Sequence, residues 1–254
     1  MSIAAQLPLD LGHRTAMGCE DFLVAPSNGD AVAWLDRWPS WPAPALTVYG
    51  PAGCGKTHLG HVWRARSHAP IANGETLDQI DLPALLARTN AVVVEDADKV
   101  AGRPANEEAL FHLYNLARDS GGHLLLLSRK PPARWRVKLA DLRSRIKAAP
   151  AVGVEAPDDA LLAAVLVKLF ADRQLRPGMD LITYLLTRME RSLDAARRVV
   201  AALDRASLAA HRPLTVPLAR EVLADLESEK GEDEDGSGNR RTPRDRVRSQ
   251  QGTG

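Results

Sequence analysis

Short runs of consecutive apolar residues recur along the first 157 residues, separated by segments of mixed polarity. Four such runs end before a polar residue or glycine: 46–49, 91–94, 124–127 and 151–154. Uninterrupted apolar runs of this length are typical of strands that are buried on both faces of a parallel sheet. Helix-like segments lie between them, at about 57–67, 76–89 and 105–119. Strands that alternate with helices predict an α/β fold whose ligands bind at the carboxyl ends of the strands.

The pattern changes after Pro157, where the strand signal stops and only helical segments follow. Asp158 is a good N-cap for a long helix that reaches about residue 174. Further helices are expected at about 179–188, 192–210 and 217–227. Residues 158–228 therefore predict a small all-α domain, which follows an α/β domain of residues 21–157.

Both ends of the chain differ in character from these two domains. Residues 1–20 hold one short apolar cluster among small and polar residues, which predicts an extended tail. Residues 229–254 contain six acidic and six basic residues but a single aliphatic one, Val247. So little apolar surface cannot offset the entropy of ordering the chain, and this segment is expected to be disordered.

The composition is that of a soluble globular protein. Of the 254 residues, 45% are hydrophobic and 26% are charged, and the formal net charge of +1 argues against a globally basic nucleic-acid coat. Two cysteines, Cys19 and Cys54, are too few for a disulfide-stapled secreted domain. No apolar run approaches the roughly 20 residues of a membrane span, and residues 1–20 show no secretory signal. We expect a cytoplasmic protein without a membrane partner.

The strongest chemical motif lies directly after the first predicted strand. It fits the pattern G-x-x-x-x-G-K-[ST] completely, with a strand before it and a helix after it, as a phosphate-binding loop requires. Glycines let backbone N–H groups turn toward phosphate oxygens, and the helix N-terminus adds a favourable dipole. Lys56 would neutralise the β- and γ-phosphates, and the Thr57 hydroxyl would bind the Mg²⁺ of the nucleotide. The residues assigned to nucleotide binding are Gly50, Pro51, Ala52, Gly53, Cys54, Gly55, Lys56, Thr57 and His58.

A second motif, Glu95 and Asp96, follows the apolar run about 40 residues after the phosphate-binding loop. Carboxylates at this place bind Mg²⁺ and orient the attacking water, so we assign Glu95 to the metal and both residues to catalysis. Their order reverses the usual one, in which Asp binds the metal and the next residue is often Glu. The exchange moves each carboxylate by about 1.5 Å, and positioning errors near 1 Å can cost about 100-fold in rate. The pattern predicts nucleotide binding with weak hydrolysis.

With these two motifs the chain resembles the AAA+ ATPases, and within them the nucleotide-binding region of the bacterial replication initiator DnaA. The resemblance includes residues 111–115, Phe-His-Leu-Tyr-Asn, and residues 127–132, which match the sensor 1 loop. Arg129 departs from that family, which usually has Asp there. Residues 141–145 look like the arginine-finger segment, with Arg145 at the finger position, and Arg191 falls at the sensor 2 position. The resemblance implies an AAA+ P-loop NTPase with a parallel-sheet core and a helical lid.

The N-terminal tail adds a further resemblance. Gln6, Leu7, Leu9 and Leu11 are similar to short peptides that insert into the hydrophobic pocket of the DNA polymerase sliding clamp. Gln6 would hydrogen-bond at the rim of that pocket while Leu9 and Leu11 fill it. After the predicted lid the chain becomes highly charged, where the initiator continues into a helix-turn-helix domain. Together these features resemble the Hda family of regulatory inactivators of DnaA, over about residues 5–228.

The Hda resemblance implies a regulator of initiation. Such a protein binds ADP or ATP with Mg²⁺, docks on the loaded clamp, and so reaches DNA indirectly. It contacts ATP-bound DnaA and promotes hydrolysis of that ATP, which negatively regulates chromosome replication initiation. Arg145 would act in trans on the charge that develops at DnaA's transferred phosphoryl group, and arginine fingers supply roughly 10³–10⁵ in rate.

Two other interpretations are weighed against this one. An autonomous AAA+ ATPase of the clamp-loader or helicase-loader kind would use Glu95 and Asp96 for its own turnover. A sequence-specific DNA-binding protein is disfavoured because a helix-turn-helix pattern is missing and the net charge is near zero. The sequence leaves open the choice between ADP and ATP, the oligomeric state (a homo-oligomer included), the effect of Arg129, and the role of residues 229–254.

Overall fold

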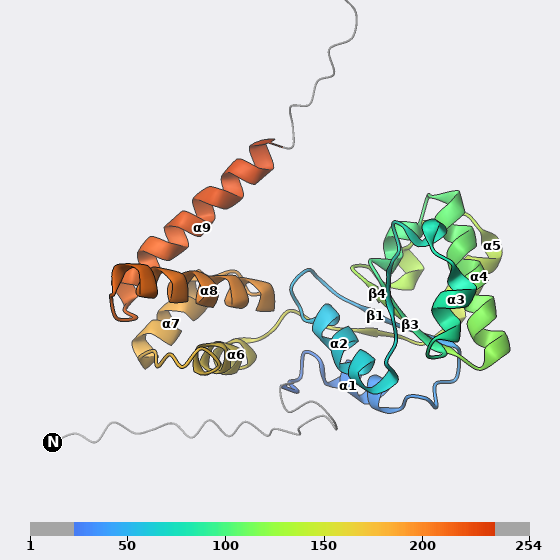
Figure 1. Cartoon of the computed structure of the whole chain (residues 1–254), viewed down its shortest axis with the longest axis horizontal. Helices are drawn as coiled ribbons and strands as arrows, with labels where there is room; N and C mark the ends of the chain where they lie inside the picture. Colours follow the sequence, from blue (N-terminus) through green and yellow to red (C-terminus); the bar gives the residue numbers. More distant parts are fainter. Residues whose placement is uncertain (1–22, 237–254) are drawn as a thin grey trace, which may run out of the picture.

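The computed structural model describes residues 23–236, which form a layered α/β unit and a bundle of helices (Figure 1). The predicted N-terminal tail and residues 237–254 lie outside the described residues. Among the helices of the described part, none has both the length and the apolar character needed to cross a membrane. The two units correspond to the α/β domain and the all-α domain that the sequence predicts.

A five-stranded parallel sheet forms the centre of the α/β unit. Its strand order is β2-β3-β4-β1-β5, and every neighbouring pair runs parallel. The central strands are almost entirely buried, which explains their uninterrupted apolar sequences. The strands are β1 (Ala45–Tyr49), β2 (Ile71–Asn73), β3 (Ala91–Glu95), β4 (His123–Ser128) and β5 (Ala151–Gly153).

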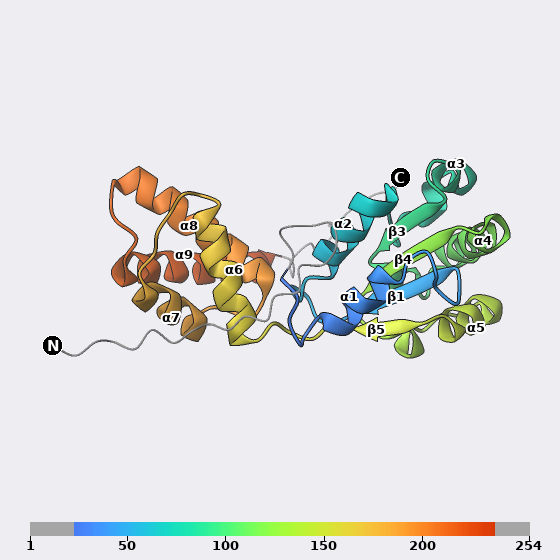
Figure 2. The same ribbon diagram turned by 90° about the horizontal axis from the view of Figure 1, so that it is seen from below.

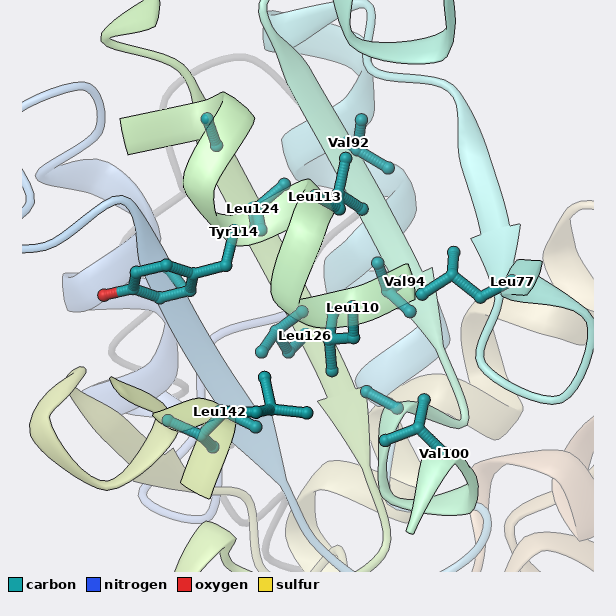
Figure 3. Packing of buried hydrophobic residues seen from close by; sticks show 14 of the residues in the cluster. Leu77, Val92, Val94, Val100, Leu110, Leu113, Tyr114, Leu124, Leu126 and Leu142 are labelled. Atoms are coloured by element: carbon teal, nitrogen blue, oxygen red, sulfur yellow. The ribbon is translucent and has the colours of Figure 1, made fainter. Parts of the chain in front are cut away.

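Helices cover both faces of this sheet, because successive residues of each strand point to opposite sides. Leu125 and Leu127 of β4 pack with α1 (Gly29–Asp36) and α2 (Lys56–Ser67). Leu124 and Leu126 face the other way, toward the remaining helices of the unit (Figures 2 and 3). Those helices are α3 (Leu82–Ala87), α4 (Pro104–Ser120) and α5 (Ala140–Ala148). The α/β prediction is thus confirmed as a three-layer fold.

Four helices with a hydrophobic core of their own form the second unit, the lid. Asp158 caps the first of them as predicted, since its carboxylate accepts a hydrogen bond from the N–H of Leu161 at 2.7 Å. Ser192 caps the third helix in the same way through the N–H of Ala195 at 3.0 Å. The helices are α6 (Asp159–Ala171), α7 (Met179–Arg188), α8 (Leu193–Ala210) and α9 (Val216–Gly236).

Three details differ from the sequence-based expectations. The helix expected at 76–89 is divided into a 3₁₀ turn, η1 (Leu77–Gln79), and α3, because the Asp81 carboxylate caps α3 by accepting from the N–H of Ala84. The short edge strand β2 and helix α1 are additional elements. Helix α9 continues to Gly236, beyond the end expected at about residue 227. Glu and Lys are good helix formers, so a helix can extend with little apolar sequence.

Candidate functional site

The phosphate-binding loop leaves the carboxyl end of β1 and leads directly into α2. Gly50 continues the strand, since its N–H donates to the carbonyl of Ser128 at 3.2 Å. Gly53 and Gly55 have φ angles of 69° and 105°, a left-handed conformation that is nearly free of cost only for glycine. Helix α2 begins at Lys56, so its first N–H groups open onto the loop. The local fold is the one that the motif predicts.

Lys56 places its ammonium group inside this loop. The Nζ atom donates hydrogen bonds to the carbonyls of Gly50 at 2.8 Å and Pro51 at 2.7 Å. It also lies 3.6 Å from the Sγ of Cys54, which is buried. A fixed positive charge is thereby held among the loop residues, where it can neutralise phosphate.

A polar cavity of about 250 Å³ lies next to the loop, at the carboxyl ends of β1, β3 and β4. It brings together the phosphate-binding loop, the two acidic residues and the sensor 1 loop, which are far apart in the sequence. Of the predicted site residues, Gly50, Pro51, Cys54, Gly55, His58 and Arg191 do not line this cavity. Its lining residues are Ala52, Gly53, Lys56, Thr57, Glu95, Asp96, Leu127, Ser128, Arg129 and Asp194. We call it the phosphate cavity.

Asp96 has a partner of its own at the edge of the phosphate cavity. Its backbone is left-handed, with φ of 49°, and its Oδ2 lies 2.9 Å from the Nζ of Lys99 in the 3₁₀ turn η2 (Ala97–Val100). The hydrogen bond that Lys99 donates to Asp96 is the largest of the contributions that raise the pKa of Lys99, and the Glu75 carboxylate, 3.5 Å away, adds to it. Lys99 thus remains positively charged and restrains the carboxylate that would orient the attacking water.

The same turn also contacts the sensor 1 loop. The backbone N–H of Arg129 donates to Oδ1 of Asp98 at 3.2 Å, and the buried Ser128 hydroxyl donates to the carbonyl of Lys130 at 2.9 Å. The loop conformation is therefore fixed by groups other than the side chain of Arg129. That side chain is exposed and free to approach a phosphate in the cavity.

A second, mainly apolar cavity of about 170 Å³ lies between the loop and the lid. Three of the predicted residues, Cys54, Gly55 and His58, line it, together with residues that the sequence analysis did not assign to the site. An apolar cavity at a domain boundary suits a flat, weakly polar group such as a nucleotide base. Those further residues are Leu23, Asn28, Leu59, Leu161, Val165, Lys168, Leu169, Leu193 and Arg197.

The lid touches the phosphate-binding loop through backbone atoms. The N–H of Leu193, at the start of α8, donates to the carbonyl of Gly53 at 2.8 Å. A Cβ atom on Gly53 would lie only 2.5 Å from the Cβ of Ser192, so this approach requires glycine. Arg191 lines neither cavity. Its guanidinium lies 3.0 Å from the Asp159 carboxylate of α6, and its side chain is 63% exposed.

The described residues hold no cluster of three or more His, Cys, Asp or Glu side chains that could bind a metal without help. Thr57 and Glu95 both line the phosphate cavity. Mg²⁺ at nucleotide sites is bound by one or two protein oxygens together with phosphate oxygens and water. These two side chains therefore fit a Mg²⁺ that arrives with the nucleotide.

Arg145 lies on α5, away from both cavities. Its guanidinium carbon is 5.5 Å from the centre of the Phe111 ring and 5.6 Å from that of Tyr114, both on α4. These distances are within the range of cation–π attraction. Helix α5 lies at the end of the α/β unit remote from the lid (Figures 1 and 2). The residue at the predicted finger position is thus held at a surface distant from the chain's own phosphate cavity.

Glu107 has a positioning role that sequence reasoning missed. Although it is buried, its carboxylate accepts hydrogen bonds from the N–H groups of Gly102 at 2.8 Å, Lys138 at 2.9 Å and Leu139 at 2.8 Å. Burial raises the pKa of Glu107, but these hydrogen bonds and the nearby charge of Lys138 outweigh it and leave the pKa below its usual value. Leu139 immediately precedes α5, so Glu107 fixes the start of the helix that carries Arg145.

The four residues assigned to clamp binding, Gln6, Leu7, Leu9 and Leu11, lie outside the described residues. Their assignment stays a prediction.

Comparison with known proteins places these features in context. Residues 159–223 match the family described as the Hda lid domain. An uncharacterized protein of Haemophilus influenzae is 30% identical over 191 residues, which cover 71% of this chain and 81% of that protein. The chromosomal replication initiator protein DnaA of Thermomicrobium roseum is 28% identical over 233 residues, 80% of this chain. Since that match covers 48% of the initiator, the chain spans about half the length of this relative.

Solved structures show the same architecture. Domain III of the Thermotoga maritima replication initiation protein DnaA superimposes with a TM-score of 0.70 at 18% identity, over 80% of this chain and 94% of that one. A replication initiator DnaA bound to AMPPCP and single-stranded DNA superimposes with a TM-score of 0.64 at 16% identity, over 85% of this chain and 68% of that one. These likenesses confirm the AAA+ fold with its helical lid.

Proposed function

Because the chain belongs to the Hda-type, DnaA-related AAA+ proteins, we propose that it binds an adenine nucleotide and promotes hydrolysis of ATP bound to DnaA. Docking on the DNA polymerase sliding clamp would bring it to DnaA on DNA. Conversion of DnaA-bound ATP to ADP would then inhibit chromosome replication initiation. The observation that carries this proposal is the position of Arg145, which lies far from the chain's own nucleotide site and near an exposed helix surface.

Nucleotide binding is supported by the two cavities on either side of the phosphate-binding loop. The phosphate cavity offers Lys56, Thr57 and the N-terminus of α2 to phosphate, and the apolar cavity has the character of a base site. A DnaA relative of the same fold binds AMPPCP, an ATP analogue. Bound Mg²⁺ would neutralise phosphate charge, and Thr57 and Glu95 would hold it. The bound nucleotide is ADP or ATP.

The chain's own hydrolysis is proposed to be weak. Asp96 would have to orient a water molecule, but its carboxylate forms an ion pair with Lys99 at 2.9 Å. Glu95 and Asp96 also stand in the reverse of the usual order. Both features disfavour the alternative function, an autonomous ATPase of the clamp-loader or helicase-loader kind.

Stimulation in trans is proposed to depend on Arg145. A guanidinium that enters the partner's site stabilises the charge developing on the transferred phosphoryl oxygens, an interaction that strengthens as that charge builds. Two aromatic rings and the Glu107 carboxylate fix its place on α5 before it meets the partner. Such preorganisation limits the entropy lost on binding.

A direct test follows ATP hydrolysis by purified DnaA in the presence of this protein and DNA-loaded clamp. Arg145→Ala is expected to keep ADP binding and clamp binding but to lower the stimulation by about 10³-fold, because a finger acts on the transition state. Arg118→Ala removes an exposed guanidinium from neighbouring α4 and is the matched control, which should keep most of the stimulation. Full stimulation by Arg145→Ala would contradict the finger assignment.

Clamp binding has a separate test. Gln6→Ala with Leu9→Ala is expected to abolish retention on immobilised clamp. The melting temperature should stay unchanged, because residues 1–20 are predicted to add little to the core. Undiminished retention would remove the clamp peptide from the proposal and leave the finger untouched.

A further inference from the structure

A group of exposed basic side chains lies on α5 and on the segment that leads into it. The 14 residues from 134 to 147 contain six basic residues and one acidic residue, Asp141, whereas the whole chain has a net charge of +1. Arg145 lies against the aromatic rings of α4 and is not counted with the others. The other five are exposed, and we call them the basic strip: Arg134, Arg136, Lys138, Arg143 and Lys147.

Sequence spacing and contacts within the fold place these five side chains on one surface. Arg136 and Lys138 flank the buried Val137, and in an extended segment such flanking residues point outward together. The Arg143 guanidinium donates to the carbonyl of Val137 at 3.4 Å, which places it between them. Lys147 follows Arg143 by four residues on α5 and shares its helix face. Arg134 ends the 3₁₀ turn η3 (Pro132–Arg134), which packs against α5.

The charges of the basic strip are not balanced by acids of the fold. None of the five side chains forms an ion pair within residues 23–228, although the described surface has many such pairs elsewhere. Two acids lie close by: Asp141, on α5 itself, and Glu107, whose carboxylate interacts with the charge of Lys138 but is already engaged by the backbone N–H groups of Lys138 and Leu139. Five neighbouring cations against these two acids generate a positive potential that attracts polyanions.

We propose that the basic strip binds the phosphate backbone of duplex DNA, as a direct contact additional to any docking on the clamp. Duplex DNA carries one negative charge per roughly 1.7 Å of its axis, so several cations in a row can each meet a phosphate. Three of the five are arginines, whose fork of donors matches phosphate oxygens. The contact needs no particular base sequence, since nothing in the strip is shaped to read base edges.

The chemistry of the strip favours duplex DNA over other polyanions. A protein partner would be expected to find an apolar or aromatic anchor, but the large exposed hydrophobic residues among those described all lie elsewhere, at Ile71, Val167, Met179 and Leu208. Single-stranded DNA is usually bound by stacking its bases on aromatic rings. The only aromatic residue of the segment, Trp135, is buried, so it offers no ring for stacking.

The strip and the finger are compatible because they occupy different faces of α5. Arg143 and Arg145 are two residues apart and so lie about 200° apart around the helix. A duplex along the strip therefore leaves Arg145 accessible to a protein partner.

The test measures binding of the full chain to a fluorescent 25-base-pair duplex of arbitrary sequence by anisotropy, over a range of KCl concentrations. Arg136→Gln with Arg143→Gln is expected to weaken binding about tenfold. It should also reduce the slope of log K against log[KCl] by about 2, one unit for each lost phosphate contact. Circular dichroism should show an unchanged melting curve, because both side chains are exposed.

Two control pairs remove the same total charge elsewhere. Arg66→Gln with Arg212→Gln alters two ion-paired arginines, and Arg240→Gln with Arg241→Gln alters the charged C-terminal segment. Each control pair is expected to weaken binding less than the strip pair does. Equal losses in all three would show that only net charge matters and would overturn the proposal. Tighter binding of a single strand, or competition by poly-glutamate as effective as by duplex, would equally overturn it.

Discussion

At the carboxyl edge of the sheet, the Lys56 ammonium, the Asp96 carboxylate and the N-terminus of α8 all have partners within the chain. On α5 and the segment before it, five basic side chains have no ionic partner among the described residues, and Arg145 rests only on two aromatic rings. In the proposed function, the first region binds the nucleotide and the second region acts on a partner. The two proposed roles would thus belong to different parts of one α/β unit.

The contrast also explains why the two regions are stabilised differently. Around the phosphate-binding loop, backbone groups of the loop and the lid bind one another directly. At the start of α5, the buried carboxylate of Glu107 holds the backbone in place by accepting a hydrogen bond from the N–H of Leu139. A substitution in either region should therefore leave the proposed function of the other region intact.

Among effects within this chain itself, the largest is expected at the phosphate-binding loop. Lys56→Ala should weaken ADP binding about 100-fold, because it removes the fixed cation and its charge-assisted hydrogen bonds to phosphate. Isothermal titration calorimetry measures this affinity. Arg66→Ala, on the same helix, is the control and should bind ADP normally. Unchanged affinity in Lys56→Ala would show that the loop motif is incidental.

Glu107→Gln should produce the second-largest effect. The amide keeps the size of the side chain but brings an NH₂ group toward backbone donors, which should lower the free energy of unfolding by about 1–3 kcal/mol. It should also reduce stimulation of DnaA, because the start of α5 loses its anchor. Urea denaturation measures the change in stability. Glu108→Gln, at the exposed neighbouring residue, is the control that removes the same charge without removing the hydrogen bonds. Equal stability of the two variants would remove Glu107 as the anchor.

The pH dependence of stability gives a third comparison. The pKa of Glu107 is lower in the folded chain than its ordinary value of 4.5, because the hydrogen bonds from backbone N–H groups outweigh the effect of burial. Its contribution is therefore complete above about pH 4.5 and is lost as the pH falls through the folded pKa. Urea midpoints between pH 3 and pH 6 should fall less steeply toward acid in Glu107→Gln than in the wild type. Parallel curves would contradict this.

The smallest effect on stability is expected at the lid surface. Arg191→Ala breaks an exposed ion pair with Asp159 and should change the free energy of unfolding by less than about 0.5 kcal/mol. If Arg191 turns from Asp159 to the phosphates when nucleotide binds, the variant should lose the protection from proteolysis that ADP gives the lid. Asp159→Asn is the control, since it frees the same arginine without removing it. Equal protection in wild type and Arg191→Ala would make Arg191 a surface charge only.

The sequence predicts the elements whose signal is local. The runs at 91–94 and 124–127 appear as buried strands because β3 and β4 contact helices on both faces, and such strands need continuous apolar sequence. Strand β2 escapes detection because it has three residues and only Ala72 is buried. The interruption before α3 follows from the cap at Asp81, a contact that competes with a longer helical pattern.

The residues of the candidate site likewise differ in whether a local sequence signal predicts them. The phosphate-binding loop is predictable because its conformation depends on its own glycines. The pairing of Asp96 with Lys99 depends on a left-handed residue within a 3₁₀ turn, which no periodic pattern marks. In the sequence, Glu107 cannot be told from any other charged residue of a polar helix. Its positioning role depends on hydrogen bonds from residues 138 and 139, which lie about 30 residues further along the chain. The apolar cavity likewise brings together Leu23, which precedes the first helix of the α/β unit, and Leu161 of the lid.

The contact between Gly53 and Ser192 has a consequence for the range of sequences that this fold accepts. A Cβ at position 53 would meet the Ser192 side chain at 2.5 Å, and the glycine also has a φ angle of 69°. Ser192 in turn is buried and caps α8. The two positions therefore form a coupled pair. A library that varies both together should return glycine at 53 in nearly every folded clone, with Ser, Thr, Asp or Asn at 192 wherever that glycine is kept.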